Sequence, residues 1–124
     1  MTFLDIRKLG RSFRHALGGL VSVFRSQQNF RLQVVGAIAV FVLIAVLPVT
    51  AMEAALLILV VASVLVIELV NTIAESLIDL LNPRLSHHAG VVKDRMAAAS
   101  LLASIAAFLV GLIIFLPYLV GTKP

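Results

Sequence analysis

Residues 32–52 read LQVVGAIAVFVLIAVLPVTAM, a run of 21 residues without a charge. A helix needs about 20 consecutive apolar residues to cross the hydrocarbon core of a bilayer. Pro48 and Thr50 lie near the end of the run, and such residues are typical of a turn. The stretch therefore predicts a membrane-spanning helix over residues 32–50.

The composition of the whole chain supports a membrane protein. Of its 124 residues, 61% are hydrophobic and only 13% are charged. Soluble domains are about half apolar and about a quarter charged. The length suits one domain, residues 1–124. The chain contains no cysteine, which excludes disulfides, thiol chemistry and zinc sites built on Cys.

Two further spans are expected downstream. The second covers residues 53–81 and ends before the Asn-Pro pair at residues 82–83, because proline cannot continue the helical hydrogen-bond ladder. The third covers residues 91–119, within a run of 27 uncharged residues at 96–122. Its first half is rich in Ala and Ser, and small residues let neighbouring helices approach closely. We therefore expect an all-α integral membrane protein with three spans.

The first segment, residues 4–28, is expected to form an amphipathic helix in the membrane interface. Arg7, Arg11 and Arg14 mostly flank or oppose its apolar stripe. The stripe consists of Leu4, Leu9, Phe13, Leu17, Leu20 and Phe24. Basic residues beside membrane spans favour anionic headgroups rather than nucleic acid as the partner. The charges also argue against a cleavable signal peptide.

The distribution of Lys and Arg predicts the orientation. The N-terminal segment and the 82–95 loop are basic and are expected in the cytoplasm. The 49–53 turn has no Lys or Arg, and the C-terminus has only Lys123. Both are expected on the outside, which an odd number of spans satisfies.

A polar stripe interrupts the second span. Glu68, Asn71, Glu75 and Asp79 are spaced three, four and four residues apart, so a helix places them on one face. The opposite face carries Leu69, Val70, Ile73 and Leu77. Acids at membrane depth are functional by default, since a central Asp costs about 2.5–3.5 kcal/mol to insert.

Simpler explanations exist for part of this stripe. Asp79 lies near the helix end and could simply contact water at the membrane interface. Asn71 could form a hydrogen bond between helices. Glu68 and Glu75 have no nearby cation in the sequence and are harder to explain in that way.

Carboxylates next to a basic loop favour phosphoryl transfer. Mg²⁺ takes carboxylate ligands together with phosphate oxygens and water. Lys93 and Arg95, at the expected cytoplasmic boundary, could meet the phosphates. The chain has no Gly-rich Walker loop, so a nucleotide would be held in another way. Proton or ion transport is the competing use of buried acids, but three unbroken spans are few for a transporter.

The motifs resemble those of the prokaryotic diacylglycerol kinase family, which includes the undecaprenol kinases. The first motif is ELVNTIAESLID at residues 68–79, and the second is VKDRMAA at residues 92–98. A third, weaker one is SFRHALGG at residues 12–19, leading to NFR at residues 29–31. The resemblance covers nearly the whole chain in order.

The resemblance implies a fold and an activity. Members are small three-span, trimeric enzymes that move the γ-phosphate of ATP to a lipid alcohol with Mg²⁺. We therefore expect an N-terminal interfacial helix plus three transmembrane helices in an oligomeric bundle, a homotrimer. The expected partners are ATP and a membrane lipid alcohol, with no nucleic acid. The expected location is the bacterial inner membrane, with the N-terminus and the site in the cytoplasm.

The resemblance also implies residue roles. Glu68 would be the general base, Glu75 and Gln27 would bind the metal, and Ser12 and Arg31 would serve the substrate or an interface. The implied nucleotide-binding residues are Asn71, Glu75, Asp79, Gly90, Lys93 and Asp94.

Two departures from the family pattern leave alternatives open. Members usually carry Glu where this chain has Gln27, whose amide is an uncharged ligand. The loop histidine appears as the pair at residues 87–88, displaced by about one residue, and its role is open. A weakened relative that binds nucleotide or lipid, and a small membrane scaffold or channel, are the alternatives. The sequence does not decide between diacylglycerol and undecaprenol.

Overall fold

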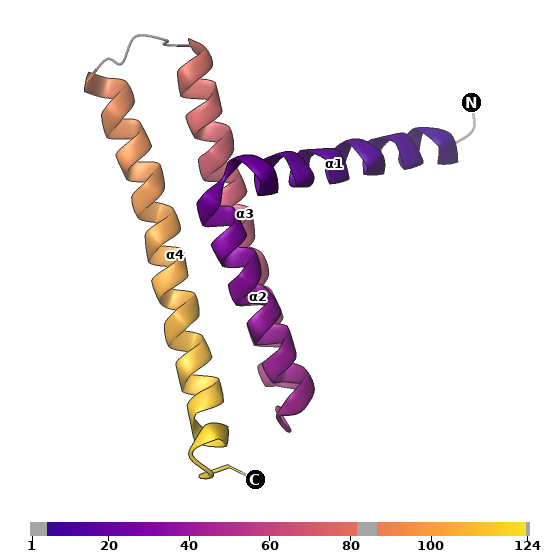
Figure 1. The fold of residues 1–124 in the computed structure, drawn as a ribbon, viewed down its shortest axis with the longest axis vertical. Helices are drawn as coiled ribbons and strands as arrows, with labels where there is room; N and C mark the ends of the chain where they lie inside the picture. The colour runs from indigo at the N-terminus through magenta and orange to yellow at the C-terminus, as the bar shows by residue number, and fades with distance from the viewer. Residues whose placement is uncertain (1–4, 82–86, 124) are drawn as a thin grey trace.

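The computed structural model describes residues 5–81 and 87–123, which are almost entirely helical and contain no strand. Four helices follow one another. They are α1 (Ile6–Ser26), α2 (Gln28–Val46), α3 (Ala51–Leu81) and α4 (His87–Leu119). Helices α2, α3 and α4 run side by side, whereas α1 extends away across their direction (Figure 1). Each of α2, α3 and α4 is long and apolar enough to cross a membrane, which confirms the predicted all-α class with three candidate spans.

The first two helices meet at a one-residue elbow, which is shorter than the gap expected from the sequence. Gln27 has an extended backbone, with φ −108° and ψ 116°, and so ends α1 and precedes α2. Arg31 then reaches back from α2, where its Nη1 donates to the carbonyl oxygens of Phe24 (3.3 Å) and Arg25 (2.9 Å). Carbonyls in the last turn of a helix lack intrahelical partners. Arg31 therefore caps α1 and fixes the elbow.

The other helix starts also differ slightly from the expected ones. Helix α3 begins at Ala51 rather than at residue 53, and α4 begins at His87 rather than at residue 91. Gly90 consequently lies in the first turn of α4, and a side chain at this position would meet open space. The expected stop at residues 82–83 lies outside the described residues.

Helix α3 begins with a reciprocal cap. The backbone N–H of Thr50 donates to Oε2 of Glu53 (2.9 Å), and the backbone N–H of Glu53 donates to Oγ1 of Thr50 (3.3 Å). This is a capping box, in which two side chains satisfy donors that the helix leaves free. The sequence contains its signature, a Thr followed three residues later by a Glu.

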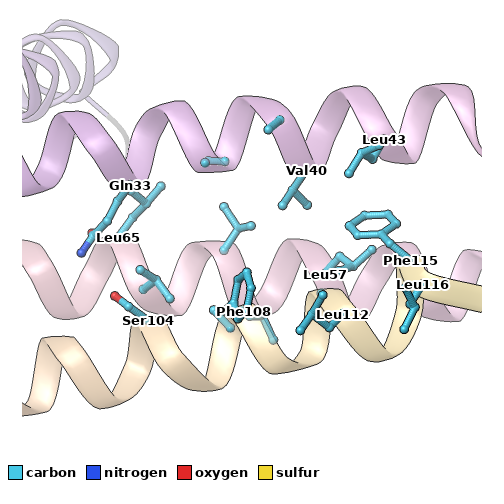
Figure 2. A pocket seen from close by; sticks show the side chains of 18 of the residues that line it. Gln33, Val40, Leu43, Leu57, Leu65, Ser104, Phe108, Leu112, Phe115 and Leu116 are labelled. Carbon is cyan, nitrogen blue, oxygen red and sulfur yellow. The ribbon is translucent and has the colours of Figure 1, made fainter. Parts of the chain in front are cut away.

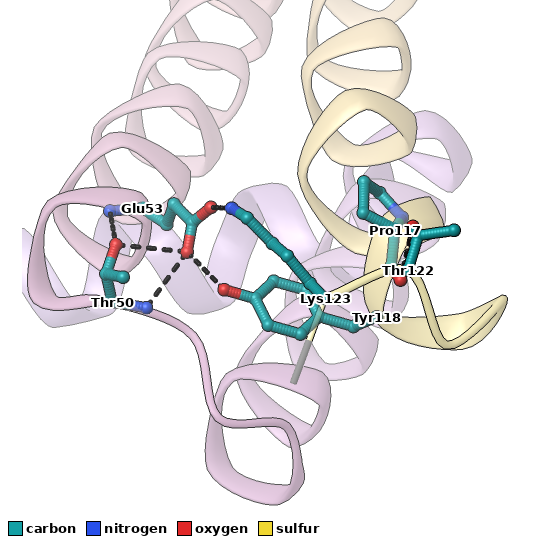
Figure 3. A network of polar contacts seen from close by, with 6 residues as sticks. All are labelled: Thr50, Glu53, Pro117, Tyr118, Thr122 and Lys123. Atoms are coloured by element: carbon teal, nitrogen blue, oxygen red, sulfur yellow. Dashed lines mark hydrogen bonds and ion pairs between the residues drawn. The ribbon is translucent and has the colours of Figure 1, made fainter.

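The same carboxylate ties α3 to the end of α4 (Figure 3). The hydroxyl of Tyr118 donates to Glu53 Oε2 (2.6 Å), and Lys123 forms an ion pair with Oε1. Gly121 makes the return turn possible with φ +72°, a conformation that glycine adopts without strain. The Glu53 carboxylate raises the pKa of Lys123, because it stabilises the charged ammonium group. The network thus closes one end of the bundle.

Replacing Glu53 with Gln is expected to lower the melting temperature by about 5 °C, because it removes the ion pair and weakens the cap. Thermal unfolding in detergent measures the effect. Lys8→Gln, at an exposed position on α1, is the control for a lost surface charge. Equal melting temperatures for all three proteins would show that the network does not stabilise the bundle.

The apolar core lies beside this network. Leu57 of α3 packs with Ile114 and Phe115 of α4, and all three are buried. Partly buried residues around them include Leu43, near the end of α2, and Leu47, which directly follows that helix. The opposite half of the bundle instead buries polar side chains. Within residues 5–81 and 87–123, the buried polar residues are Glu68, Asn71, Thr72 and Ser100.

An apolar groove of about 400 Å³ lies between α2 and α4, with α3 as its floor. Small residues such as Gly36, Ala107 and Gly111 leave this space. Gln33 and Ser104 line it at one end, and Leu43 and Phe115 line it towards the other (Figure 2). The groove therefore connects the apolar core with the polar half of the bundle.

Candidate functional site

The acid stripe of α3 faces inward, as the helical spacing predicts. Only 2% of the surface of Glu68 and 6% of that of Asn71 are exposed. Glu75 is half-buried, and Asp79, at the end of the helix, is exposed. The opposite face is exposed and apolar, and includes Val70, Ile73 and Leu77. The stripe thus passes from the inside of the bundle to its surface.

Glu68 is held by donors from both neighbouring helices. Nε2 of Gln33, on α2, donates to Glu68 Oε2 at 3.2 Å, and the hydroxyl of Ser100, on α4, donates to the same oxygen. On α3 itself, the hydroxyl of Thr72 donates to the carbonyl oxygen of Glu68 (3.0 Å). A buried carboxylate is tolerated only when it is hydrogen-bonded or paired. Gln33 and Ser100 therefore give the Glu68 carboxylate a fixed orientation.

The carboxylate borders a polar cavity of about 310 Å³ between α2, α3 and α4. Among the described residues, no Lys or Arg lines it. The lining residues are Asn29, Leu32, Gln33, Glu68, Asn71, Glu75, Ala97, Ser100, Leu101 and Ser104. The lining residues from α3 are Glu68, Asn71 and Glu75, which belong to the polar stripe predicted from the sequence. Four polar lining residues were not predicted as site residues: Asn29, Gln33, Ser100 and Ser104.

Asn71 and Glu75 form an oxygen-rich pair in this cavity. Nδ2 of Asn71 donates to Oε1 of Glu75 at 3.3 Å. Oδ1 of Asn71 is buried and has no hydrogen-bond partner among the described residues. An unpaired buried acceptor costs about 1–3 kcal/mol. A ligand that occupies this oxygen would recover that free energy.

The donor set fits Mg²⁺. A carboxylate and an amide oxygen are hard ligands of the kind that Mg²⁺ prefers. Within residues 5–81 and 87–123 there is no cluster of three or more His, Cys, Asp or Glu that could hold a metal. The chain would therefore supply only part of the coordination shell. Mg²⁺ in kinase sites commonly takes its other ligands from phosphates and water.

An ion pair between Asp79 and Lys93 lies at the end of the bundle next to the cavity. Asp79 is one turn beyond Glu75 on α3, and Lys93 is one turn before Ala97 on α4. Both side chains are partly or largely exposed, and an exposed pair contributes only about 0–1 kcal/mol. Lys93 can therefore exchange its carboxylate partner for another anion at little cost.

The remaining predicted site residues do not line the cavity. Gln27 and Arg31 lie at the elbow between α1 and α2. The hydroxyl of exposed Ser12 donates to the backbone of its own helix. Gly90 lies in the first turn of α4 and Asp94 is exposed on the same helix. The structure thus brings together the stripe and the Asp–Lys pair, and places these five residues outside the cavity.

The paired histidines begin α4. His87 and His88 are exposed, and their rings meet edge to face with centroids 6.1 Å apart. As described above, they belong to no metal-binding cluster of the described residues.

Comparison with known proteins decides the family. The model of the prokaryotic diacylglycerol kinase family matches residues 14–115, which is most of the chain. The chain belongs to this family. The match includes every residue of the polar cavity and the Asp79–Lys93 pair. The family identified from the sequence motifs, a family of lipid kinases, is confirmed.

Two relatives illustrate the range of this family. A diacylglycerol kinase of Synechocystis sp. (strain PCC 6803) is 39% identical over 111 residues, which cover 89% of this chain. The chain spans only 63% of the length of that relative. An undecaprenol kinase of Bacillus subtilis (strain 168) is 29% identical over 117 residues, which cover 93% of this chain and 94% of the relative.

Proposed function

We propose that the protein phosphorylates a membrane lipid alcohol, diacylglycerol or undecaprenol, with ATP as the phosphate donor and Mg²⁺ as the cofactor. The central observation is the buried Glu68 carboxylate in a polar cavity that adjoins an apolar groove. The names of the two relatives support both lipids as candidates. The common feature of these lipids is a hydroxyl group on a long apolar tail.

The residues of the chain take distinct roles in this reaction. Glu68 accepts the proton of the lipid hydroxyl, and Gln33 and Ser100 keep its carboxylate oriented. Glu75 and Asn71 would hold the metal, which would supply positive charge to offset that of the transferring phosphate. Lys93 leaves Asp79 to contact a phosphate of the nucleotide.

Assembly and orientation complete the proposal. The end of the bundle that carries the Asp79–Lys93 pair and α1 faces the cytoplasm of a bacterial inner membrane. The exposed apolar side chains of α1, such as Phe13 and Leu17, insert into the interface. A homotrimer covers part of the exposed helix surface, and crosslinking in mild detergent tests it. A monomer alone would contradict this assembly.

Transfer of labelled γ-phosphate from ATP to each lipid, with Mg²⁺, tests the function. Both lipids are assayed in parallel with folded, purified protein. Product from one lipid establishes the kinase and its substrate. Transfer to neither lipid would contradict the proposed function and favour a relative that binds nucleotide or lipid without efficient transfer.

The presence of Gln at position 27 favours a second candidate function, in which the protein binds nucleotide or lipid without efficient phosphate transfer. The family usually has a carboxylate at this position, and an amide lacks the charge that holds Mg²⁺ strongly. Gln27→Glu is expected to lower the Mg²⁺ concentration for half-maximal transfer about tenfold, since added ligand charge tightens binding of hard cations. Mg²⁺ titration of the initial rate measures it.

Gln28→Glu adds the same charge at the neighbouring position, which lies at the exposed start of α2. The expected Mg²⁺ dependence of this control is that of the unmodified protein. An equal gain in both variants would indicate a general charge effect and would remove the role of Gln27.

A further inference from the structure

The half of α1 next to α2 carries a surface hollow that the proposed reaction does not use (Figure 1). Its volume is about 480 Å³, and it is lined by Gly18, Val21, Ser22, Arg25 and Ser26. These residues are spaced three, one, three and one apart, so α1 places them on one face over about two turns. A Cβ added at Gly18 would meet no atom within 4 Å, so the space above this glycine is open.

Two polar side chains of the hollow have no partner among the described residues. Every other described serine donates its hydroxyl to a carbonyl or carboxylate oxygen, as Ser26 does within its own helix at 3.4 Å. The Ser22 hydroxyl makes no such bond within residues 5–81 and 87–123. The ion pairs in this part of the chain involve Lys93 and Lys123, but not Arg25. A hydroxyl donor and a guanidinium group therefore line the same hollow without a protein acceptor.

The charge of α1 favours an anion in the hollow. The helix contains no Asp or Glu, and the acid that precedes it, Asp5, already accepts hydrogen bonds as its N-cap. Its basic residues are Arg7, Lys8, Arg11, Arg14 and Arg25. Arginine binds phosphate oxygens through parallel N–H donors, and a neighbouring hydroxyl can donate to the same group. Arg25 and Ser22 thus match a phosphate group.

One border of the hollow is apolar. Val21 is exposed and lies about one turn from Leu17 and Phe24, which are exposed members of the apolar stripe of α1. Ser26 lies about 140° further round the helix than Val21. With the stripe in the membrane interface, Val21 is on the lipid side of the hollow and Ser26 on the water side. A free anion would use only the polar donors, whereas a phospholipid would use both borders.

We propose that this hollow binds the headgroup of an anionic phospholipid, with Arg25 and Ser22 donating to the phosphate and Val21 lying against the acyl chains. This lipid is a component of the surrounding membrane and is separate from the substrate in the polar cavity. The carbonyl oxygen of Arg25 also accepts from Arg31 Nη1 at 2.9 Å. The bound headgroup therefore holds the elbow between α1 and α2 at headgroup level. The inference rests on the proposed interfacial position of α1, and not on the proposed kinase activity.

Binding of phosphatidylglycerol to the detergent-solubilised protein, measured by native mass spectrometry, tests the proposal. Phosphatidylcholine, whose headgroup has no net charge, is titrated in parallel. We expect phosphatidylglycerol to bind about tenfold more tightly, the effect of a charge-assisted hydrogen bond. Arg25→Gln is expected to lose this preference. Arg11→Gln removes the same charge about 21 Å further along the helix and should retain it.

Two neighbouring glycines separate a shaped site from attraction by the charge of α1 as a whole. Gly18→Leu fills the hollow without a change in charge and is expected to weaken binding of phosphatidylglycerol about tenfold. Gly19→Leu adds the same side chain next to it, at a residue that does not line the hollow, and should leave binding unchanged. Both added side chains would start in open space, and Leu favours a helix more than Gly does, so both variants are expected to fold.

Several results would overturn this site. These are equal binding of the two lipids, equal losses in Arg25→Gln and Arg11→Gln, and undiminished binding in folded Gly18→Leu. Displacement of phosphatidylglycerol by excess inorganic phosphate would overturn the assignment to a lipid. Thermal unfolding shows whether each variant is folded. Ser22→Ala, with an expected loss of several-fold, replaces any variant that is not. The experiment involves no phosphate transfer, so its outcome is separate from that of the kinase assay.

Discussion

Glu68→Gln is expected to lower kcat for lipid phosphorylation by about 10²- to 10⁴-fold, the range that a positioned general base contributes. The substitution preserves the size of a side chain that is 98% buried, so the bundle is expected to fold. An amide cannot accept the hydroxyl proton, whereas the present carboxylate is held ready by Gln33 and Ser100. Initial rates of γ-phosphate transfer, with both substrates saturating, measure the loss.

Glu53→Gln is the matched control for this change. It makes the same replacement on the same helix, but in the network at the opposite end of the bundle. Its expected effect is on thermal stability, and kcat below the melting temperature should stay close to that of the unmodified protein. A folded Glu68→Gln variant with undiminished kcat would exclude Glu68 as the base.

The spans could be predicted because uncharged runs and bilayer thickness determine them together. The run at residues 32–52 contains most of α2, and the change from apolar to polar after residue 67 marks the inward face of α3. The elbow at Gln27 could not be placed in this way, because no Gly or Pro marks it. It depends on Arg31, which caps a helix that precedes it in the chain.

The candidate site could be predicted only one helix at a time. Periodicity groups Glu68, Asn71 and Glu75 because they share α3. It does not show which residues of α2 and α4 face them, since that depends on how the helices pack. The available signals were a lone Gln33 in an apolar run and Ser100 within an Ala-rich segment. The small residues of α4 suggested close packing, and the structure adds a direct hydrogen bond from Ser100 to Glu68.

Glu75→Gln is expected to lower kcat/KM for MgATP at least about 100-fold, because a neutral ligand gives up several kcal/mol of charge stabilisation at the metal. The amide oxygen of Gln can still accept the hydrogen bond that Asn71 Nδ2 donates to Glu75. The local packing is therefore retained while the charge is lost. Rates measured over a range of Mg²⁺ concentrations should show weaker activation, with partial recovery at high Mg²⁺.

The same variant also distinguishes a kinase from a membrane scaffold. In a kinase, Glu75→Gln removes transfer while thermal stability and the crosslinking pattern stay those of the unmodified protein. In a scaffold, a half-buried acid facing the neighbouring helices would instead serve assembly, and its loss would change the crosslinked species. Ser76→Ala is the control, because among the described residues the Ser76 hydroxyl donates only to the carbonyl oxygen of Thr72, on its own helix. Altered assembly in Glu75→Gln alone, without an effect on Mg²⁺ activation, would contradict a metal-binding role for this carboxylate.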